Sequence, residues 1–463
     1  MNITLLGLIL IPLGLYGILF NSKLLYTLTI FFIPFTATAV LVIGDDDGSV
    51  LLATVFFGLL WIIQTIISNS LSKNLFKSKS SLPIGGLLLI LFLFNCYASI
   101  FLIPLNGNFQ IFSIDIGRFV PLSYEIYHIY HLFFISYGVL FSICMIKHND
   151  SLEKLISTLK IYTFAIIFAI LWGLVEVYSN IIGSYFPYFI FNNTPSDVQL
   201  GDTVRKLGEI GFFRMSSVGD EPSMIARTIL ISLPLYLTSY SYGINIFSRK
   251  LDTLILFIIC LGLFASASSS ALSGAVIIFT GSILLKAYLE SRFLKPFLII
   301  FSIIFLVAIF YLNNQQFASF LDFIFLGKLS SDSFFARLAT VTDSLEAFKA
   351  LPFFGAGFGS ITSDDLIIKL LSNTGIFGFL LFIFMLIFTQ VGLLTNLKKS
   401  PLKSKYLMLL QISISLMFFT YWSITQIGGW SHQFQTGFFA LGLALSFVSI
   451  KDNFFKQELN LKA

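Results

Sequence analysis

Long apolar runs, separated by short polar stretches, recur along this sequence from end to end. A transmembrane helix needs about 20 mostly apolar residues to cross a hydrocarbon layer ~30 Å thick, and many of the runs approach that length. Only 11% of the residues are charged, whereas a soluble domain has about 25%. A water-soluble fold is therefore excluded. The sequence predicts an all-α, polytopic bundle of transmembrane helices.

The polar breaks divide the apolar runs into about thirteen predicted spans. The first run lacks the basic residues that precede a signal-peptide core, so it is counted as a span. The predicted spans cover residues 3–20, 25–43, 49–68, 84–104, 126–146, 159–180, 224–242, 251–265, 271–285, 296–313, 374–396, 405–425 and 431–449.

Two connections, 181–223 and 314–373, are far longer than a turn between helices requires, and long loops are often functional. We expect short helices in both. They separate N-terminal helices (1–180), central helices (224–313) and C-terminal helices with a tail (374–463). In the second loop, an amphipathic repeat predicts a helix. Its apolar positions are Phe334, Leu338, Val341, Leu345 and Phe348.

Basic residues predict which side of the membrane each connection faces. Lysine accumulates in cytoplasmic loops, and here it falls mainly in alternate connections. This pattern places the N-terminus and both long loops outside the cytoplasm. The lysines of the predicted cytoplasmic side are Lys23, Lys73, Lys77, Lys79, Lys147, Lys154, Lys160, Lys250, Lys286, Lys295, Lys398, Lys399, Lys403, Lys405, Lys451, Lys456 and Lys462.

The arginines go against this bias. Five of the seven, Arg118, Arg205, Arg214, Arg227 and Arg337, lie in or beside the outer connections. A planar guanidinium pairs bidentately with phosphate, so outer arginines at the membrane surface suit a lipid that carries a diphosphate. The alternative is that each arginine pairs with a nearby carboxylate for structural reasons.

The densest polar cluster is the stretch RMSSVGDEPSMIA, from Arg214 to Ala226, which Arg227 follows directly. Pro222 suits the first turn of a helix, and Glu221 stands where a helix N-terminus favours negative charge. The acids therefore have a structural explanation as well as a functional one. Arg227 is harder to explain structurally, because a guanidinium that enters the apolar layer is costly without a partner.

A second cluster follows Arg337 and includes PFFGAGFGS, residues 352–360. Gly355 and Gly357 offer a backbone that could cradle an anion, although G-x-G-x-G alone is a weak signal. Asp364 and Asp365 stand just before an apolar run, where they could be functional or could cap a helix.

Other polar groups carry weaker signals. His128 and His131 could form half of a metal site, but no second pair accompanies them, and polar packing is the favoured interpretation. His432 follows GGW at the outer mouth of the last span, where it could bind sugar. Glu176 lies near the outer end of the sixth span, and its burial would mark it as functional or paired.

The two polar clusters, and the order in which they follow one another along the chain, resemble those of the superfamily of O-antigen polymerases (Wzy-type) and O-antigen ligases. Its members have many spans and an arginine followed by a turn, an acid and a proline before a span. They also have a long outer loop with a second arginine, a proline and a glycine-rich stretch. The segments Arg214–Ala226 and Arg337–Gly359 match these two elements.

The ligases have a further signature, in which a histidine and a small polar residue are followed by nine residues and then by G-x-x-G. In this chain Asp364 and Asp365 occupy the first two positions, and Gly375 and Gly378 complete the pattern with the same spacing. Because the histidine is missing, the resemblance favours a polymerase over a ligase.

The resemblance implies a membrane glycosyltransferase that uses neither a metal ion nor a cofactor. It would transfer a growing glycan from undecaprenyl diphosphate to the non-reducing end of a lipid-linked repeat unit, at the periplasmic face of the bacterial inner membrane. The implied partners are the undecaprenyl-diphosphate-linked oligosaccharide and polysaccharide, the lipid bilayer and a chain-length regulator protein, with no nucleic acid.

The resemblance also suggests roles for individual side chains. Arg214 and Arg337 would bind the diphosphate, and Asp364 or Glu221 would orient or deprotonate the acceptor hydroxyl. The expected substrate-binding residues are Arg227, Arg205, Gly355, Gly357, Asp365 and His432.

Two other functions remain open. A ligase would pass the same glycan to the lipid A core. A flippase or exporter of lipid-linked oligosaccharide would have a similar size and span count, but it should place charges deep in its spans along a substrate path.

Overall fold

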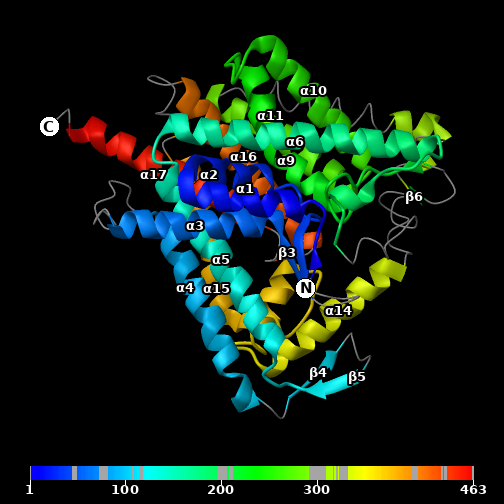
Figure 1. Cartoon of the computed structure of the whole chain (residues 1–463), viewed down its shortest axis with the longest axis vertical. Helices are drawn as coiled ribbons and strands as arrows, with labels where there is room; N and C mark the ends of the chain where they lie inside the picture. Colours follow the sequence, from blue (N-terminus) through cyan, green and yellow to red (C-terminus); the bar gives the residue numbers. More distant parts are fainter. Residues whose placement is uncertain are drawn as a thin grey trace.

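The computed structural model of the chain is mostly helical (Figure 1). It describes residues 2–43, 49–71, 82–106, 109–113, 118–194, 206–207, 212–290, 309–315, 318–319, 322, 332–395, 397, 405–428, 431 and 435–460. The longer helices are α1 (Gly7–Phe20), α2 (Ser22–Phe31), α3 (Ala53–Leu71), α4 (Ile84–Phe101), α5 (Ile126–His148), α6 (Leu152–Ile181), α9 (Pro222–Tyr242), α10 (Arg249–Ser266), α11 (Ser269–Glu290), α14 (Asp332–Ala350), α15 (Leu366–Leu394), α16 (Lys405–Gly428) and α17 (Thr436–Asn460).

The chain is a multi-pass membrane protein. Among the described residues, six helices are long and apolar enough to cross a membrane, namely α4, α5, α6, α11, α15 and α16. The count of about thirteen spans stays a prediction. Most of the predicted span 296–313 lies outside the described residues.

Short strands accompany the helices. One antiparallel sheet has the order β1 (Asn2–Ile3), β2 (Ala39–Ile43) and β3 (Ser49–Leu52). Two hairpins follow later in the chain. They pair β4 (Gln110–Ser113) with β5 (Arg118–Pro121), and β6 (Lys206–Leu207) with β7 (Phe212–Phe213). Two 3-10 turns, η1 (Ile103–Asn106) and η2 (Tyr188–Ile190), complete the described elements.

The predicted span over residues 25–43 is wrong. Helix α2 ends at Phe31, shortly before Pro34, and residues 39–43 form β2 instead. Proline does not continue a helix interior, and the β-branched sequence AVLVI favours an extended strand. The apolar run is therefore continuous in sequence but contains two kinds of secondary structure.

The second predicted long loop, residues 314–373, contains helix in two places. The predicted amphipathic helix is present as α14, which ends just before Pro352. The last predicted loop residues belong to α15, which begins at Leu366 rather than at residue 374 because Asp365 caps it. The Asp365 side chain accepts a hydrogen bond from the Ile368 amide at 2.9 Å. The backbone of α15 is then interrupted at Gly375, which has φ 63° and ψ −171°.

Helix α6 runs from one end of the bundle to the other, from left to right in Figure 1. At the lysine end, defined by Tyr26, Asn149 and Lys154, the ends of α2, α5 and α6 meet. At the arginine end, defined by Glu176, Arg214 and Arg227, α6 meets the segment before α9. Twenty-two residues of α6 separate Lys154 from Glu176, a rise of about 33 Å, which matches the hydrocarbon thickness.

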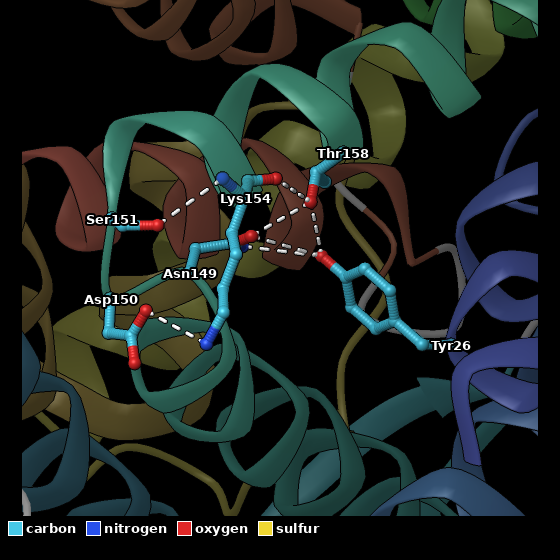
Figure 2. A network of polar contacts seen from close by, with 6 residues as sticks. All are labelled: Tyr26, Asn149, Asp150, Ser151, Lys154 and Thr158. Carbon is cyan, nitrogen blue, oxygen red and sulfur yellow. Dashed lines mark hydrogen bonds and ion pairs between the residues drawn. The ribbon is translucent and has the colours of Figure 1, made fainter.

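The lysine end is closed by a network of neutral hydrogen bonds (Figure 2). The Tyr26 hydroxyl lies 2.6 Å from the Thr158 hydroxyl, which donates to Asn149 Oδ1 at 2.8 Å. Lys154 stays half exposed and pairs with Asp150 at 2.9 Å. The connection between α5 and α6 is thus held in place without burial of an ion pair.

Candidate functional site

The arginine end is built around the start of α9. Glu221 is the N-cap residue with extended backbone angles, and Pro222 occupies the first turn, where its fixed φ suits a helix and its missing amide costs nothing. One turn later, Arg227 is buried, with 7% of the residue exposed. The sequence therefore places a guanidinium inside the bundle while keeping it near a helix end.

A small, partly open cleft lies beside Arg227. Its walls come from the segment after α2, the start of α9, the last turns of α16 and the start of α17. Apart from Met224, every lining side chain carries a polar group. The lining residues are Thr36, Met224, Arg227, Thr228, Tyr421, Ser431 and Thr436.

Ionisable groups from distant parts of the chain interact electrostatically with Arg227, the charged residue of the cleft. The groups within electrostatic reach of Arg227 are Tyr421, Glu221, Arg337 and Asp364. Arg337 is exposed on α14, and Asp364 precedes α15, where its Oδ2 lies 3.5 Å from the Thr340 hydroxyl of α14. The structure thus places Glu221, Arg337 and Asp364 within electrostatic reach of Arg227, and their common role in one site stays a prediction.

Arg214 stands beside the same group of charges. Burial lowers the pKa of Arg214 from its ordinary value, and the Glu221 carboxylate opposes this change. Because the pKa of arginine starts so high, Arg214 remains charged at neutral pH. Arg214 therefore brings a positive charge, beside the Glu221 carboxylate, to the segment that leads into α9.

Glu176 holds that segment in place. Its carboxylate is fully buried and accepts hydrogen bonds from the amides of Ser216 and Ser217, at 3.0 and 2.6 Å. Ser217 adopts a positive φ of 58°, which an L-residue rarely adopts without external support. Glu176 is therefore buried and paired with backbone, and it positions the residues between Arg214 and Glu221.

The glycine-rich stretch packs against the interruption in α15. Gly355 and Gly357 have φ values of 71° and 103°. The amides of Ala356 and Gly357 donate to the Ser372 and Asn373 carbonyls, at 2.8 and 3.2 Å. These glycines allow a close backbone approach, which explains their presence structurally. Direct contact of Gly355 and Gly357 with substrate stays a prediction.

The two adjacent aspartates have different surroundings. Asp365 caps α15 and also accepts a hydrogen bond from Gln426 of α16 at 2.8 Å, so it fixes one helix against another. Asp364 instead lies among the charges of Arg227 and Lys369. Of the two, Asp364 is the better placed for chemistry.

Some expected residues stand apart from this cluster. His128 bonds to Ser360, and His131 packs against Gly359. No group of three or more metal-ligating side chains occurs in the part of the chain that the structure describes. Arg205 and His432 lie outside the described residues.

Sequence reasoning missed several residues of the site. Tyr421 and Thr36 line the cleft, and Gln426 anchors the loop before α15. Tyrosine and threonine are common near membrane boundaries, so neither carried a signal of its own. Gln426 did carry a signal in the sequence, because it is a polar residue at the end of an apolar span.

No family model matches this chain, and no curated protein matches it either. The likeness to O-antigen polymerases and ligases therefore rests on the motifs quoted above.

Proposed function

We propose that the protein polymerises a surface polysaccharide by transferring a growing glycan from undecaprenyl diphosphate to a lipid-linked repeat unit, at the periplasmic face of the inner membrane. The observation that carries the proposal is the buried Arg227 beside a polar cleft, with Arg337, Glu221 and Asp364 within electrostatic reach. The resemblance described above points to the same reaction.

The first requirement of this reaction is a site for the diphosphate. In surroundings of low dielectric constant, a guanidinium attracts an anion more strongly than it does in water. The hydroxyls of Thr36, Tyr421 and Thr436 line the same cleft and can donate hydrogen bonds to phosphate oxygens. Arg337, which is exposed on α14 and within electrostatic reach of Arg227, suits the part of the diphosphate that stays nearer to water. Such positive groups stabilise the leaving diphosphate as the glycosidic bond to it breaks.

The second requirement is an activated acceptor hydroxyl. As the sugar hydroxyl attacks the anomeric carbon, its proton must leave, and a carboxylate within reach can accept it. We assign this role to Asp364. The new glycosidic bond replaces the bond to the diphosphate, and undecaprenyl diphosphate leaves with the bonding electron pair. Glu221 is the second candidate, although it lies closer to Arg214 and the start of α9.

The placement of charge favours a transferase over a flippase. Among the described residues, the buried Glu176, Arg227 and Asp252 each lie within two turns of a helix end, and the buried Lys451 bonds to the C-terminal end of α15. A transport path would need charged groups deep in the spans, along its length. The described charges gather at the two ends of the bundle instead.

Deletion of the gene in its host, followed by gel analysis of surface polysaccharide, tests the proposal. We expect the ladder to disappear and single repeat units to remain attached to the core. Full-length polymer that accumulates without attachment would identify a ligase. Lipid-linked repeat units trapped at the cytoplasmic face would identify a flippase. Either result would overturn polymerisation.

A further inference from the structure

The start of α5 carries an unusual density of tyrosine and histidine. In the stretch Tyr124–His131, YEIYHIYH, the side chains of Tyr124, Tyr127, His128 and His131 recur at positions i, i+3, i+4 and i+7. Tyr127, His128 and His131 lie on one side of the first turns of α5, and Tyr124, in the extended segment before the helix, stacks on the His128 ring. We call these four side chains the tyrosine–histidine face.

The helical part of this face, Tyr127, His128 and His131, lies opposite the exposed side of α5. Ile126 and Ile129, on the other side of the same turns, are 83% and 53% exposed, and they mark the side of α5 that the hydrocarbon covers. His128, in contrast, is fully buried. Tyrosines that only anchor a helix in the membrane interface would share the exposed side with the isoleucines. The tyrosine–histidine face therefore requires another explanation.

The face is held rigidly. His128 Nε2 lies 2.9 Å from the Ser360 hydroxyl, directly after the glycine-rich stretch, while His128 Nδ1 bonds to the backbone of Glu125. The ring of Tyr127 packs 4.1 Å from the ring of His128. Tyr124 lies nearly parallel to the His128 ring at 5.8 Å, and about half of its side chain, 51%, stays exposed. An ordered aromatic ring with an accessible surface is thus available.

The face is connected to the arginine end through charged neighbours. Lys369 is within electrostatic reach of His131 and also of Asp364. Asp364 in turn lies within reach of Arg227. In Figure 1 the start of α5 and the hairpin β4–β5 lie beside the lower end of α14, the helix that carries Arg337, and β4 contacts α14. The tyrosine–histidine face therefore borders the site proposed above.

We propose that the tyrosine–histidine face binds a sugar ring of the lipid-linked repeat unit, an inference that rests on the proposed polymerase function. Tyrosine offers a flat apolar surface with a polar hydroxyl, which fits a pyranose with its apolar C–H face and hydroxyl rim. Glu125 is exposed beside Tyr124 and adds a carboxylate acceptor for sugar hydroxyls. Binding here holds the repeat unit next to Asp364, while its diphosphate stays at the arginines.

Two probes separate this inference from the proposed function. One is the free oligosaccharide, released by mild acid from the lipid-linked repeat units of host cells that lack the gene. The other is undecaprenyl diphosphate without sugar. Binding of each probe to the purified full-length protein is measured by calorimetry. Thermal unfolding of each variant shows that it is folded.

We expect Tyr124→Ala to weaken oligosaccharide binding about tenfold and to leave binding of undecaprenyl diphosphate unchanged. Tyr124→Phe, which keeps the ring, should bind the oligosaccharide nearly as wild type does. The control Ile126→Ala, on the lipid side of the same turn, should change neither. Arg227→Ala should weaken binding of the diphosphate lipid alone.

Oligosaccharide binding by Tyr124→Ala that equals wild type would overturn the sugar-binding face but leave the polymerase proposal intact. An equal loss of oligosaccharide binding in Ile126→Ala would also overturn the sugar-binding face. If wild-type protein bound neither probe, both proposals would fail together.

Discussion

The two ends of the bundle use polar residues in different ways. At the lysine end, Tyr26, Asn149 and Thr158 satisfy one another with neutral hydrogen bonds, and Lys154 stays half exposed beside Asp150. At the arginine end, Arg227 is buried beside a cleft, and its charged neighbours come from α14 and the loop before α15. The first arrangement joins α2 to α6 and to the connection between α5 and α6 through uncharged groups. The second gathers charged groups near a polar cleft.

This difference shows how stability and function can be separated in one membrane protein. Neutral hydrogen bonds contribute about 1 kcal/mol each and are easily satisfied between helix ends. A buried guanidinium is costly to desolvate, so it is retained where an anion or a partner uses it. The comparison predicts that substitutions at the arginine end change activity, whereas those at the lysine end change only stability.

Arg227→Ala should have the largest effect. Loss of a positioned donor for a developing anion typically slows a reaction by about 100- to 1000-fold, so the polysaccharide ladder should disappear. Arg227→Lys should also be impaired, because an ammonium lacks the planar fork. The matched control is Arg249→Ala, an exposed arginine at the start of α10. If both alanine variants gave equal ladders at equal membrane abundance, the proposed functional role of the arginine end would be contradicted.

Glu176→Ala should destabilise the arginine end. The substitution leaves the buried amides of Ser216 and Ser217 without their carboxylate acceptor, and we expect a loss of about 3 kcal/mol. The purified variant should unfold several degrees below wild type in a thermal scan. An unchanged unfolding temperature would mean that this carboxylate does not position the segment before α9.

Asp364→Asn should reduce polymer formation about 100-fold, because the amide cannot accept the proton of the acceptor hydroxyl. Asp365→Asn is the matched control. Asparagine caps helices about as well as aspartate, so this variant should fold and remain active. The measurement is the rate of chain growth in membranes supplied with lipid-linked repeat units. If Asp365→Asn were impaired and Asp364→Asn remained active, the role of proton acceptor would belong to Asp365 instead.

Tyr26→Phe should have the smallest effect. The variant removes a hydroxyl from the lysine end, but the Thr158 hydroxyl can still donate its proton to Asn149 Oδ1 or to the Lys154 carbonyl. We expect about 1 kcal/mol of destabilisation, seen as a small decrease in unfolding temperature, and a normal ladder. Loss of polymer in a folded Tyr26→Phe variant would show that the lysine end takes part in function.

Much of the fold was visible in the sequence because each feature depended on local residues. The apolar runs predicted membrane-spanning helices, and the repeat from Phe334 to Phe348 predicted α14. Pro222 and Glu221 indicated where α9 begins. The strand at 39–43 was missed because hydropathy alone was weighed, although Pro34 and the β-branched residues after it carried the signal.

The site could be predicted only in part. Charged residues that are rare in apolar sequence stood out, which is why Arg227, Glu221, Arg337 and Asp364 were proposed. Tyr421 and Thr36 were missed because only the packing of α9 against α16 and the segment after α2 gives them a role. The interruption at Gly375 likewise depends on contacts with the backbone of residues 352–354, twenty or more residues earlier.

The account depends most on which side of the membrane each end faces. Cys96 and Cys144 are buried, so Cys260→Ser gives a suitable background for thiol labelling. In intact spheroplasts, a membrane-impermeant maleimide should label Glu346→Cys, an exposed position on α14, and should label Lys154→Cys only after the membrane is permeabilised. The opposite result, with Lys154→Cys labelled from outside and Glu346→Cys protected, would place the arginine end in the cytoplasm and contradict the account.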